Sequence, residues 1–458
     1  MRNSWLSRRA DMPSMASIAP DILSHRIQRA IDTAVSSKSG IRVYSHYDAD
    51  GVSAAAILSR ALERAGVQFQ TTLIKGLSRQ FVASLDDLKS YIFMDMGSGH
   101  LPALEEKHLA VVLDHHKPER DSDSVVHVNT HLLGVDGTSE ACAATLAFLF
   151  AIGLDHRNWD LVPVAVVGMV GDKQHLGGFK GVNALVVKAA LEKGLLVNKR
   201  GLLVGKGSLM DALAGSFDPF FCGVSGNPGG ASIFLSENGF SPEQKASMLS
   251  EEELGRLASL LALDMVGRGV DADVIRSISG SRLFDPSSKR YIDTMVEYAN
   301  SSGKANMGGF GAAMLLGSPW AVETVEENFN AYRSLLLERL VELEKNGARI
   351  QGSLQYVEND DFKLNGAIAG IGMQFILPQD KPVFSLAETK DKVKISSRGT
   401  KKLTGAGLDL SVVCKMSAEK VDGEGGGHPI AAGATIPKDA KSTFLDEASK
   451  TIYSQIEN

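Results

Sequence analysis

The sequence is poor in cysteine and contains no long apolar segment. Its three cysteines, Cys142, Cys222 and Cys414, are far apart and form no C-x-x-C pair. This argues against a disulfide framework or a thiolate zinc site and fits a reducing cytoplasm. No apolar run reaches the roughly 18 residues that a bilayer span requires, so we expect no membrane partner. Residues 1–14 carry basic side chains but no apolar segment, and we expect no signal peptide.

The charge balance and the aromatic content limit how the chain could bind nucleic acid. A formal net charge of −6 argues against a general basic coat, so binding would need a local basic patch or bound metal. Aromatic residues make up only 6% of the chain, which leaves few platforms for base stacking. Contacts with a nucleic-acid substrate would therefore be made mainly with its phosphates, and binding would depend strongly on salt.

The first part of the chain alternates short apolar strands with helical patterns. We expect strands at 41–47, 69–74, 91–95, 110–114 and 125–129, and helices at 51–65 and 139–152. This alternation predicts an α/β fold with a parallel sheet that is covered by helices on both faces. In such sheets, ligands bind beyond the carboxyl ends of the strands.

The rest of the chain reads as three further parts. Residues 191–320 are mostly helical and loop-rich, and apolar residues at steps of three and four predict a connector helix at 321–346, stopped by Asn346-Gly347. Beyond it the pattern turns strand-rich in stretches that include GAIAGIGMQFIL and SVVCKMS, which predicts a mixed α/β domain. With a length of 458 residues, we expect an N-terminal domain at 22–190, a middle region at 191–320, the connector, and a C-terminal domain at 347–458.

Acidic and histidine side chains follow several of the early apolar runs. They lie in the stretches SHYDADG, FMDMGSGH, VVLDHHKPE and VPVAVVGMVGDKQ, which supply His46, Asp48, Asp50, Asp95, Asp114, His115, His116 and Asp172. We expect all four runs to be strands of one parallel sheet, whose carboxyl ends lie side by side. Converging carboxylates repel one another unless divalent cations bind between them. Mixed carboxylate and imidazole ligands favour two Mn²⁺ ions, with Mg²⁺ as an alternative.

Each of these signals has a simpler explanation when it is taken alone. A lone aspartate at a strand end usually caps a helix or forms a turn, as we expect of Asp136. A lone pair of histidines is more often solvated than bound to metal. The joint occurrence of the four motifs favours a metal site.

A second phosphate signal lies near the C-terminus, in DGEGGGHPIAAGA. Gly425, Gly426 and Gly427 could line an anion nest with their backbone N–H groups, and His428 adds a donor. Upstream, KDKVKISSRGTKK places Arg398 among lysines, where it could hold a phosphate bidentately. The alternative is a flexible glycine hinge beside a solvated basic strand.

The four acidic motifs resemble, in order and spacing, those of the DHH phosphoesterase superfamily. GGGHPIAAGA and SSRG resemble the DHHA1 domain that accompanies it. The resemblance implies that His46, Asp48 and Asp95 hold one metal ion, and that Asp95 bridges to a second ion held by Asp50, His115 and Asp172. It further implies that Asp114 orients the histidines and that His116 contacts substrate phosphate or acts through its neighbours. Arg398, the three glycines and His428 would bind substrate.

Within that superfamily the chain looks like the RecJ-like single-strand exonucleases, most of all the archaeal GINS-associated nucleases. This implies a metal-dependent exonuclease that acts on single-stranded DNA or RNA, in replication, repair or RNA turnover, with GINS as a possible partner. One alternative is a nanoRNase-like or cyclic-dinucleotide phosphodiesterase, although the middle region favours polymer substrates. The other is a replisome scaffold that binds GINS, although such scaffolds have lost metal ligands that this chain keeps.

Overall fold

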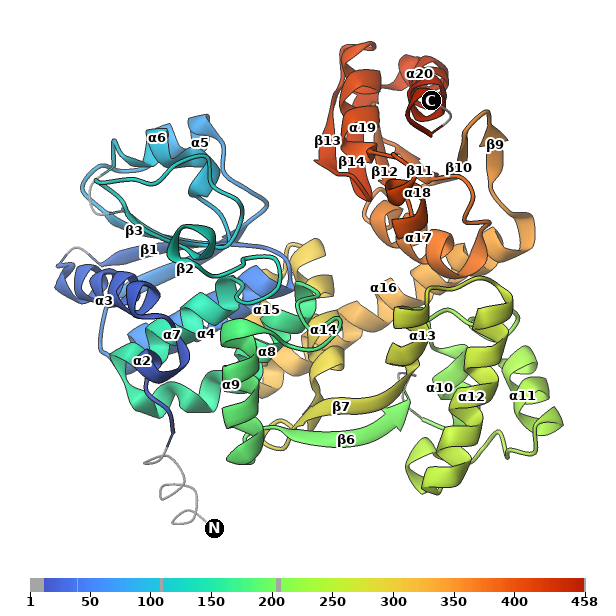
Figure 1. Cartoon of the computed structure of the whole chain (residues 1–458), viewed down its shortest axis with the longest axis horizontal. Coiled ribbons are helices and arrows are strands. Elements are labelled where there is room, and N and C mark those ends of the chain that lie inside the picture. The colour runs from blue at the N-terminus through green and yellow to red at the C-terminus, as the bar shows by residue number, and fades with distance from the viewer. Residues whose placement is uncertain (1–11, 39, 108–109, 203–206, 457–458) are drawn as a thin grey trace. The chain divides into compact units, whose positions relative to one another are not determined.

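The computed structural model describes residues 12–38, 40–107, 110–202 and 207–456 (Figure 1). Residues 1–11, which belong to the N-terminal segment where no signal peptide is expected, lie outside these ranges, as do the last two residues of the expected C-terminal domain. The chain divides into two compact units. One combines the residues up to Lys199 with Ser281–Asn330, and the other combines Arg200–Gly280 with Ala331–Asn458. The expected middle region is thus shared between both units, and the four expected domain bounds stay predictions.

The first unit contains the predicted parallel sheet. Its five strands run in the order β2-β1-β3-β4-β5, and all four pairings are parallel. The strands are β1 (Ile41–His46), β2 (Phe69–Ile74), β3 (Ser90–Met94), β4 (Ala110–Asp114) and β5 (Val126–Asn129). Their pairings align the carboxyl ends of β1, β3 and β4, so that the loops after these strands share one edge of the sheet. Every residue of β3 and β4 is buried, as expected for central strands of a sheet covered on both faces.

The helices of the first unit pack on this sheet and on one another. They are α2 (Met15–Ile18), α3 (Asp21–Ser36), α4 (Ala49–Arg64), α5 (Arg79–Ala83), α6 (Leu101–Leu104), α7 (Ala143–Leu154), α8 (Val162–Gly171), α9 (Gly181–Glu192), α14 (Ile292–Lys304) and α15 (Gly308–Leu315). Helices α4, α7 and α8 form the main contacts among them. Helix α14, from the expected middle region, backs the loop after β1, since the Asn300 side chain accepts a hydrogen bond from Ala49 N at 2.9 Å.

The prediction of a strand before Asp172 was wrong. Residues Val162–Gly171 form helix α8, and Asp172 follows its last turn. Pro163 stands in the first turn, where a missing N–H costs nothing, and Val162 to Met169 are all buried. A helix that is apolar on every side has no 3.6-residue pattern, so its valine-rich sequence could not be told from a buried strand.

The second unit is built on a six-stranded mixed sheet of order β13-β14-β12-β11-β10-β9. The strands are β9 (Arg349–Gln351), β10 (Leu354–Asn359), β11 (Val383–Glu388), β12 (Lys392–Arg398), β13 (Glu424–His428) and β14 (Ala431–Pro437). The helices of this unit, labelled in Figure 1, are α10 (Leu209–Ala214), α11 (Pro228–Glu237), α12 (Glu251–Gly267), α13 (Ala272–Ile278), α17 (Asn365–Ile371), α18 (Lys401–Gly405), α19 (Leu410–Glu419) and α20 (Lys441–Ile456). The predicted connector is confirmed as helix α16 (Pro319–Asn346). A smaller sheet joins β6 (Val197–Leu202), β7 (Ser279–Asp285) and β8 (Arg290–Tyr291).

Two stretches of the C-terminal part that were predicted as strands are helical. GAIAGIGMQFI forms α17 and a π-helical turn, and SVVCKMS lies in α19. The Asp409 side chain caps α19 by accepting a hydrogen bond from Ser411 N at 2.9 Å. Val413 and Cys414 are buried while Val412 is exposed, so one face of this short helix is apolar. In so few residues the helical period is too brief to be distinguished from a strand.

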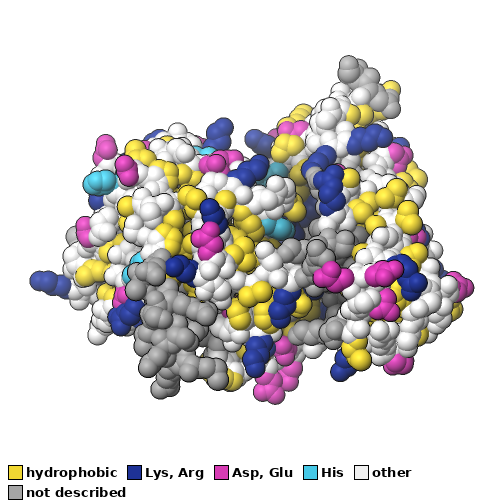
Figure 2. Space-filling model, turned by 60° about the horizontal axis from the view of Figure 1, so that its bottom comes forward, with side chains coloured by type: hydrophobic (Ala, Val, Ile, Leu, Met, Phe, Trp, Pro, Cys, Tyr) yellow, Lys and Arg dark blue, Asp and Glu magenta, His cyan; other side chains and the backbone are white. Residues whose placement is uncertain are grey.

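The helices and the charged surface both agree with the composition. None of the described helices is long and apolar enough to cross a membrane. On the face drawn in Figure 2, basic and acidic side chains are interspersed among neutral and apolar ones over the described residues. The described residues of this face therefore carry charges of both signs and form no general basic coat.

Candidate metal centre and anion site

The loop after β1 is shaped by the residues of SHYDADG. His46 ends β1, and Asp48 caps α4 with its side chain, which accepts a hydrogen bond from Gly51 N at 3.0 Å. Asp50 lies in the first turn of α4. A Cβ atom on Gly51 would lie 2.2 Å from the His46 carbonyl oxygen, so this tight turn requires glycine. The local sequence therefore directs all three polar side chains to the carboxyl edge of the sheet.

Seven of the predicted residues meet at this edge in three overlapping groups of three. His46, Asp48 and Asp95 form one group, Asp50, His115 and Asp172 form another, and the exposed His116 forms the third with Asp95 and His115; within each group the potential ligand atoms lie within 4.8 Å of one another. The first two groups have the membership that the sequence predicts for the two ions. Asp95 touches both groups, with Oδ2 at 3.3 Å from His46 Nδ1 and Oδ1 at 3.1 Å from His115 Nε2. Asp172 reaches the centre from the end of a helix, with Oδ2 at 3.7 Å from His115 Nδ1.

Asp95 is held in an unusual backbone conformation. Its φ angle of 58° lies in the left-handed region, and its N–H donates to the Leu113 carbonyl at 3.0 Å. The residue is only 4% exposed, and its Oδ2 atom is buried without a hydrogen-bond donor. A buried carboxylate oxygen without a donor is costly, and a metal ion would remove that cost. The residues present therefore fit a divalent cation.

The pKa values in this cluster reflect crowding of like charge. Burial, and then the charge of Asp95, raise the pKa of Asp50 to about 8, although Asp50 accepts hydrogen bonds from Ala143 N and Ala144 N at the start of α7. Burial raises the pKa of Asp172 to about 6. Burial opposes the charged form of His46, but the Asp48 and Asp95 carboxylates, at 3.0 and 3.3 Å from its Nδ1, outweigh this and raise its pKa to about 10. Bound divalent cations would supply the positive charge that protons supply in this arrangement.

Asp114 organises the two histidines that follow it. Its Oδ1 accepts hydrogen bonds from His115 N at 2.8 Å and from His116 N at 3.1 Å, and it lies 2.8 Å from His116 Nδ1. Burial disfavours the Asp114 carboxylate, but His116 and backbone donors outweigh it and lower its pKa. The His116 side chain is 59% exposed, so its ring faces solvent beside the cluster.

Gln174 is a component of the centre that was not predicted from the sequence. Its Nε2 donates to Asp172 Oδ2 and to the Gly137 carbonyl, both at 2.8 Å. The same carbonyl lies 2.7 Å from His115 Nδ1, which can donate to it and leave Nε2 free to bind metal. Asn183 holds the Gln174 Oε1 atom at 2.7 Å. The sequence signal that could have indicated Gln174 is its position two residues after the motif aspartate Asp172, in DKQ.

Asp136 behaves as the turn residue that we expected. Its side chain accepts hydrogen bonds from the backbone and hydroxyl of Thr138 and from the hydroxyl of Ser139. These bonds lower its pKa to about 2. It belongs to neither group of ligands.

The three glycines predicted to line an anion nest lie in a strand, and their role in binding substrate stays a prediction. Gly425, Gly426 and Gly427 lie in the edge strand β13 and not in a loop. A Cβ atom on Gly425 would lie 2.3 Å from the Cys414 carbonyl oxygen of α19, and Gly427 has a φ angle of 143°. Close packing of α19 thus explains Gly425, and the positive φ angle together with the close backbone of β14 explains Gly427, without an anion.

Arg398 and His428 nevertheless lie in one row across the sheet. Ala431 pairs with Arg398 on β12 and with His428 on β13. Arg398 Nη1 donates to the Ser397 carbonyl at 2.9 Å, and no carboxylate pairs with Arg398 among the residues described. Burial lowers the pKa of this guanidinium. A partly buried cation without a counter-ion is suited to bind an anion such as phosphate.

Comparison with known proteins identifies two families along the chain. Residues 40–168 match the DHH family, N-terminal domain, and residues 353–454 match the DHHA1 domain. An uncharacterized protein of Methanocaldococcus jannaschii is 28% identical over 446 residues, which cover 94% of this chain and 98% of that protein. The match extends through the middle region as well as the two domains.

Solved structures share the fold over most of the chain. RecJ from Thermus thermophilus in complex with Mn²⁺ has a TM-score of 0.59 and 17% identity; the match covers 95% of this chain and 55% of RecJ, so this chain spans about half of that protein. A second structure, of exonuclease RecJ bound to manganese, has a TM-score of 0.57 and 17% identity. The match covers 96% of this chain and 94% of that structure's chain. CDC45 from Entamoeba histolytica has a TM-score of 0.65 and 13% identity, and the match covers 94% of this chain and 98% of CDC45. At these identities the likeness concerns the fold.

Proposed function

We propose that this chain, a member of the DHH/DHHA1 phosphoesterase superfamily, is a metal-dependent exonuclease that removes nucleotides from an end of single-stranded DNA or RNA. The observation that carries the proposal is Asp95, whose buried carboxylate joins two groups of potential ligands. These residues would hold two divalent cations, which would supply Lewis-acid chemistry for the hydrolysis of a phosphodiester.

The contacts around each side chain support the ligand roles that the family resemblance implies. His46 and Asp48 would hold one ion with Asp95, and Asp50, His115 and Asp172 would hold the other with it. Mn²⁺ is the preferred ion because two imidazoles are among the ligands, and Mg²⁺ is an alternative. When bound, the ions supply a strong positive charge to the reacting phosphate. The protein fixes the ligands before substrate arrives, since Asp50 is tied to α7 and His115 to the Gly137 carbonyl.

His116 and Asp114 act on the substrate side of the centre. Asp114 fixes the His116 ring through Nδ1, which leaves Nε2 directed away from the carboxylate. The exposed ring can then donate a hydrogen bond to the scissile phosphate or hand a proton to the leaving oxygen. Because the pKa of His116 is raised by Asp114, the ring carries this proton readily.

Arg398 and His428 bind a phosphate that does not react. Their shared row across the sheet supports this role, as does the lack of a carboxylate partner for the partly buried Arg398 among the described residues. The second unit thus supplies binding energy, and the first unit supplies the chemistry.

The experiment is digestion of 5′-labelled and 3′-labelled DNA and RNA single strands with Mn²⁺ or Mg²⁺, beside blunt duplexes of the same sequence. We expect stepwise shortening from one end of the single strands, with duplexes resistant, and no reaction in excess chelator. Cleavage at internal sites, or full activity in chelator, would contradict the proposal. Hydrolysis restricted to dinucleotides or cyclic dinucleotides would favour the short-substrate alternative.

A structural role beside GINS is a separate proposal. It is supported by the shared fold of CDC45 alone. A pull-down with GINS, using the wild type and an Asp50→Asn variant, would test whether partner binding is independent of the metal centre.

A further inference from the structure

One face of the second unit's sheet carries a row of cations beside a strip without large side chains. Along β12 the residues alternate, so that Lys392, Lys394, Ser396 and Arg398 point to one face, while Val393, Ile395 and Ser397 are buried on the other. Helices α19 and α20 contribute to the core on the buried side. On the other side α17 packs on β11 and β12, and beyond it the faces of β14 and β13 stay partly or fully exposed.

The register of the strands sets these side chains in parallel rows. Arg398, Ala431 and His428 form the first row, Ser396, Gly433 and Gly426 the second, and Lys394, Thr435 and Glu424 the third. The middle row has no side chain larger than a hydroxymethyl group. A Cβ atom on Gly426 would meet nothing within 4 Å, so this glycine faces open space. Neighbouring rows are about 7 Å apart, because two residues of a strand span that length.

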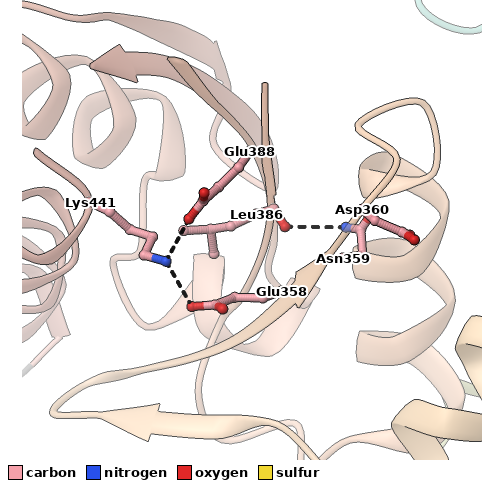
Figure 3. Close-up of a pocket in the computed structure, with 6 residues that line it drawn as sticks. All are labelled: Glu358, Asn359, Asp360, Leu386, Glu388 and Lys441. Carbon is pink, nitrogen blue, oxygen red and sulfur yellow. Dashed lines mark hydrogen bonds and ion pairs between the residues drawn. The ribbon is translucent and has the colours of Figure 1, made fainter. Parts of the chain in front are cut away.

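The cations of this face lack counter-ions, unlike other lysines of the same unit. No carboxylate lies in ion-pair contact with Lys392, Lys394 or Arg398 among the described residues, and Lys394 Nζ rests 4.1 Å above the Phe362 ring. Glu424 stands in the row of Lys394, but two strands away, at about 10 Å. In contrast, Lys441 in the pocket of Figure 3 is held between Glu388 at 3.0 Å and Glu358 at 3.2 Å.

We infer that this face is a track for the backbone of a single strand that runs parallel to β12, over the exposed faces of β14 and β13 beside α17, with Arg398 and His428 at one phosphate and Lys394 and Lys392 at later ones. The inference deepens the exonuclease proposal and rests on it. The spacing of the rows is of the same order as that of successive phosphates in an extended strand. The small residues of the middle row let a sugar–phosphate chain approach the sheet closely, while Ser396 and Thr435 offer hydroxyl donors. A dinucleotide reaches only the first row, so the face selects polymers over short substrates.

Kinetics on two substrate lengths test the track. The assay compares kcat/KM for a single-stranded dodecamer with kcat/KM for a dinucleotide, at several salt concentrations. Lys394→Ala and Lys392→Ala should each lower the ratio of dodecamer to dinucleotide roughly two- to fivefold, the weight of an exposed ion pair. Each should also reduce the slope of log kcat/KM against log salt for the dodecamer by about 0.7, as expected for one lost phosphate contact.

Gly426→Val provides a test that leaves every cation in place. A β-branched residue suits a strand and finds open space here, so the fold should persist, as circular dichroism would verify. The branched side chain would fill the space over the middle row. It should therefore lower the ratio of kcat/KM for the dodecamer to kcat/KM for the dinucleotide at every salt concentration. Lys450→Ala is the matched control, because Lys450 pairs with Glu447 on α20, away from these rows. This variant should leave both the kcat/KM ratio and the salt slope unchanged.

The outcomes separate this inference from the exonuclease proposal. Suppose the wild type degrades the dodecamer, but all three variants keep its dodecamer-to-dinucleotide kcat/KM ratio and its salt slope. The inference of a track is then wrong, while the exonuclease proposal stands. If the wild type hydrolyses neither substrate with Mn²⁺, the exonuclease proposal itself fails. If the wild type prefers the dinucleotide, the face does not select polymers and the inference is overturned.

Discussion

Replacing Asp95 with asparagine should have opposite effects on activity and on the stability of the metal-free protein. Asparagine keeps the shape and one side-chain oxygen, and it tolerates the left-handed backbone at φ 58°. The change removes the charge that both groups of ligands share. If each ion contributes several kcal/mol to the transition state, losing about 4 kcal/mol would lower kcat/KM roughly 10³-fold.

Stability should respond in the other direction when chelator is present. Four carboxylates are crowded at the centre, and Asp95 is the largest source of charge repulsion on Asp50. Removing one charge should therefore hold or raise the melting temperature of the metal-free variant. With Mn²⁺ at about 100 times its Kd, each bound ion should stabilise the wild type by about 2.7 kcal/mol, and the variant should lose most of this gain.

Differential scanning fluorimetry with and without Mn²⁺, paired with single-strand digestion, measures both effects. Asp32→Asn is a matched control, since Asp32 is exposed on α3 and its carboxylate accepts a hydrogen bond from the Gln28 side chain at 2.9 Å, away from the metal centre. This variant should change neither the melting temperature, with or without Mn²⁺, nor the rate of single-strand digestion. The reasoning would be refuted if Asp95→Asn kept both the Mn²⁺-dependent stabilisation and near wild-type turnover.

Three further predictions concern the metal, the anion site and Gln174. Excess EDTA should abolish hydrolysis, and Mn²⁺ should restore it at least as well as Mg²⁺; restoration by neither ion would contradict the ligand assignment. Arg398→Ala and His428→Ala should each lower kcat/KM on single-stranded DNA roughly 10–100-fold, with a much smaller loss on bis-p-nitrophenyl phosphate; equal losses would mean that this row belongs to the chemical site. Gln174→Ala should weaken Mn²⁺ binding about 10–100-fold by calorimetry, because Asp172 and the Gly137 carbonyl lose their shared donor, and Gln174→Glu should not restore it; unchanged affinity would show that the amide only fills space.

The predictable parts of the centre are those whose chemistry is local. Apolar strands that end in acids and histidines are visible as short sequence patterns, and β2 and β4 have the predicted bounds. The parallel order of the sheet then brings the ends of β1, β3 and β4 together without any further information. Asp95 and His115 could therefore be placed at one site from the sequence.

The parts that were missed depend on contacts between distant segments. Gln174 matters because the chain folds back to place Gly137 and Asn183 against it, which no local pattern records. The glycine run of β13 gave no sign of its strand structure, because the packing of Gly425 against Cys414 of α19 cannot be read from the run itself. Likewise α8 is buried on all sides, so the period that separates helix from strand is missing.

Anomalous diffraction at the manganese edge, from crystals soaked in Mn²⁺, tests the central claim most directly. The account predicts two peaks at the carboxyl edge of the parallel sheet, one beside His46 and Asp48 and one beside Asp50, His115 and Asp172, with Asp95 contacting both. No peak at this edge, or peaks only at other acidic side chains, would contradict it.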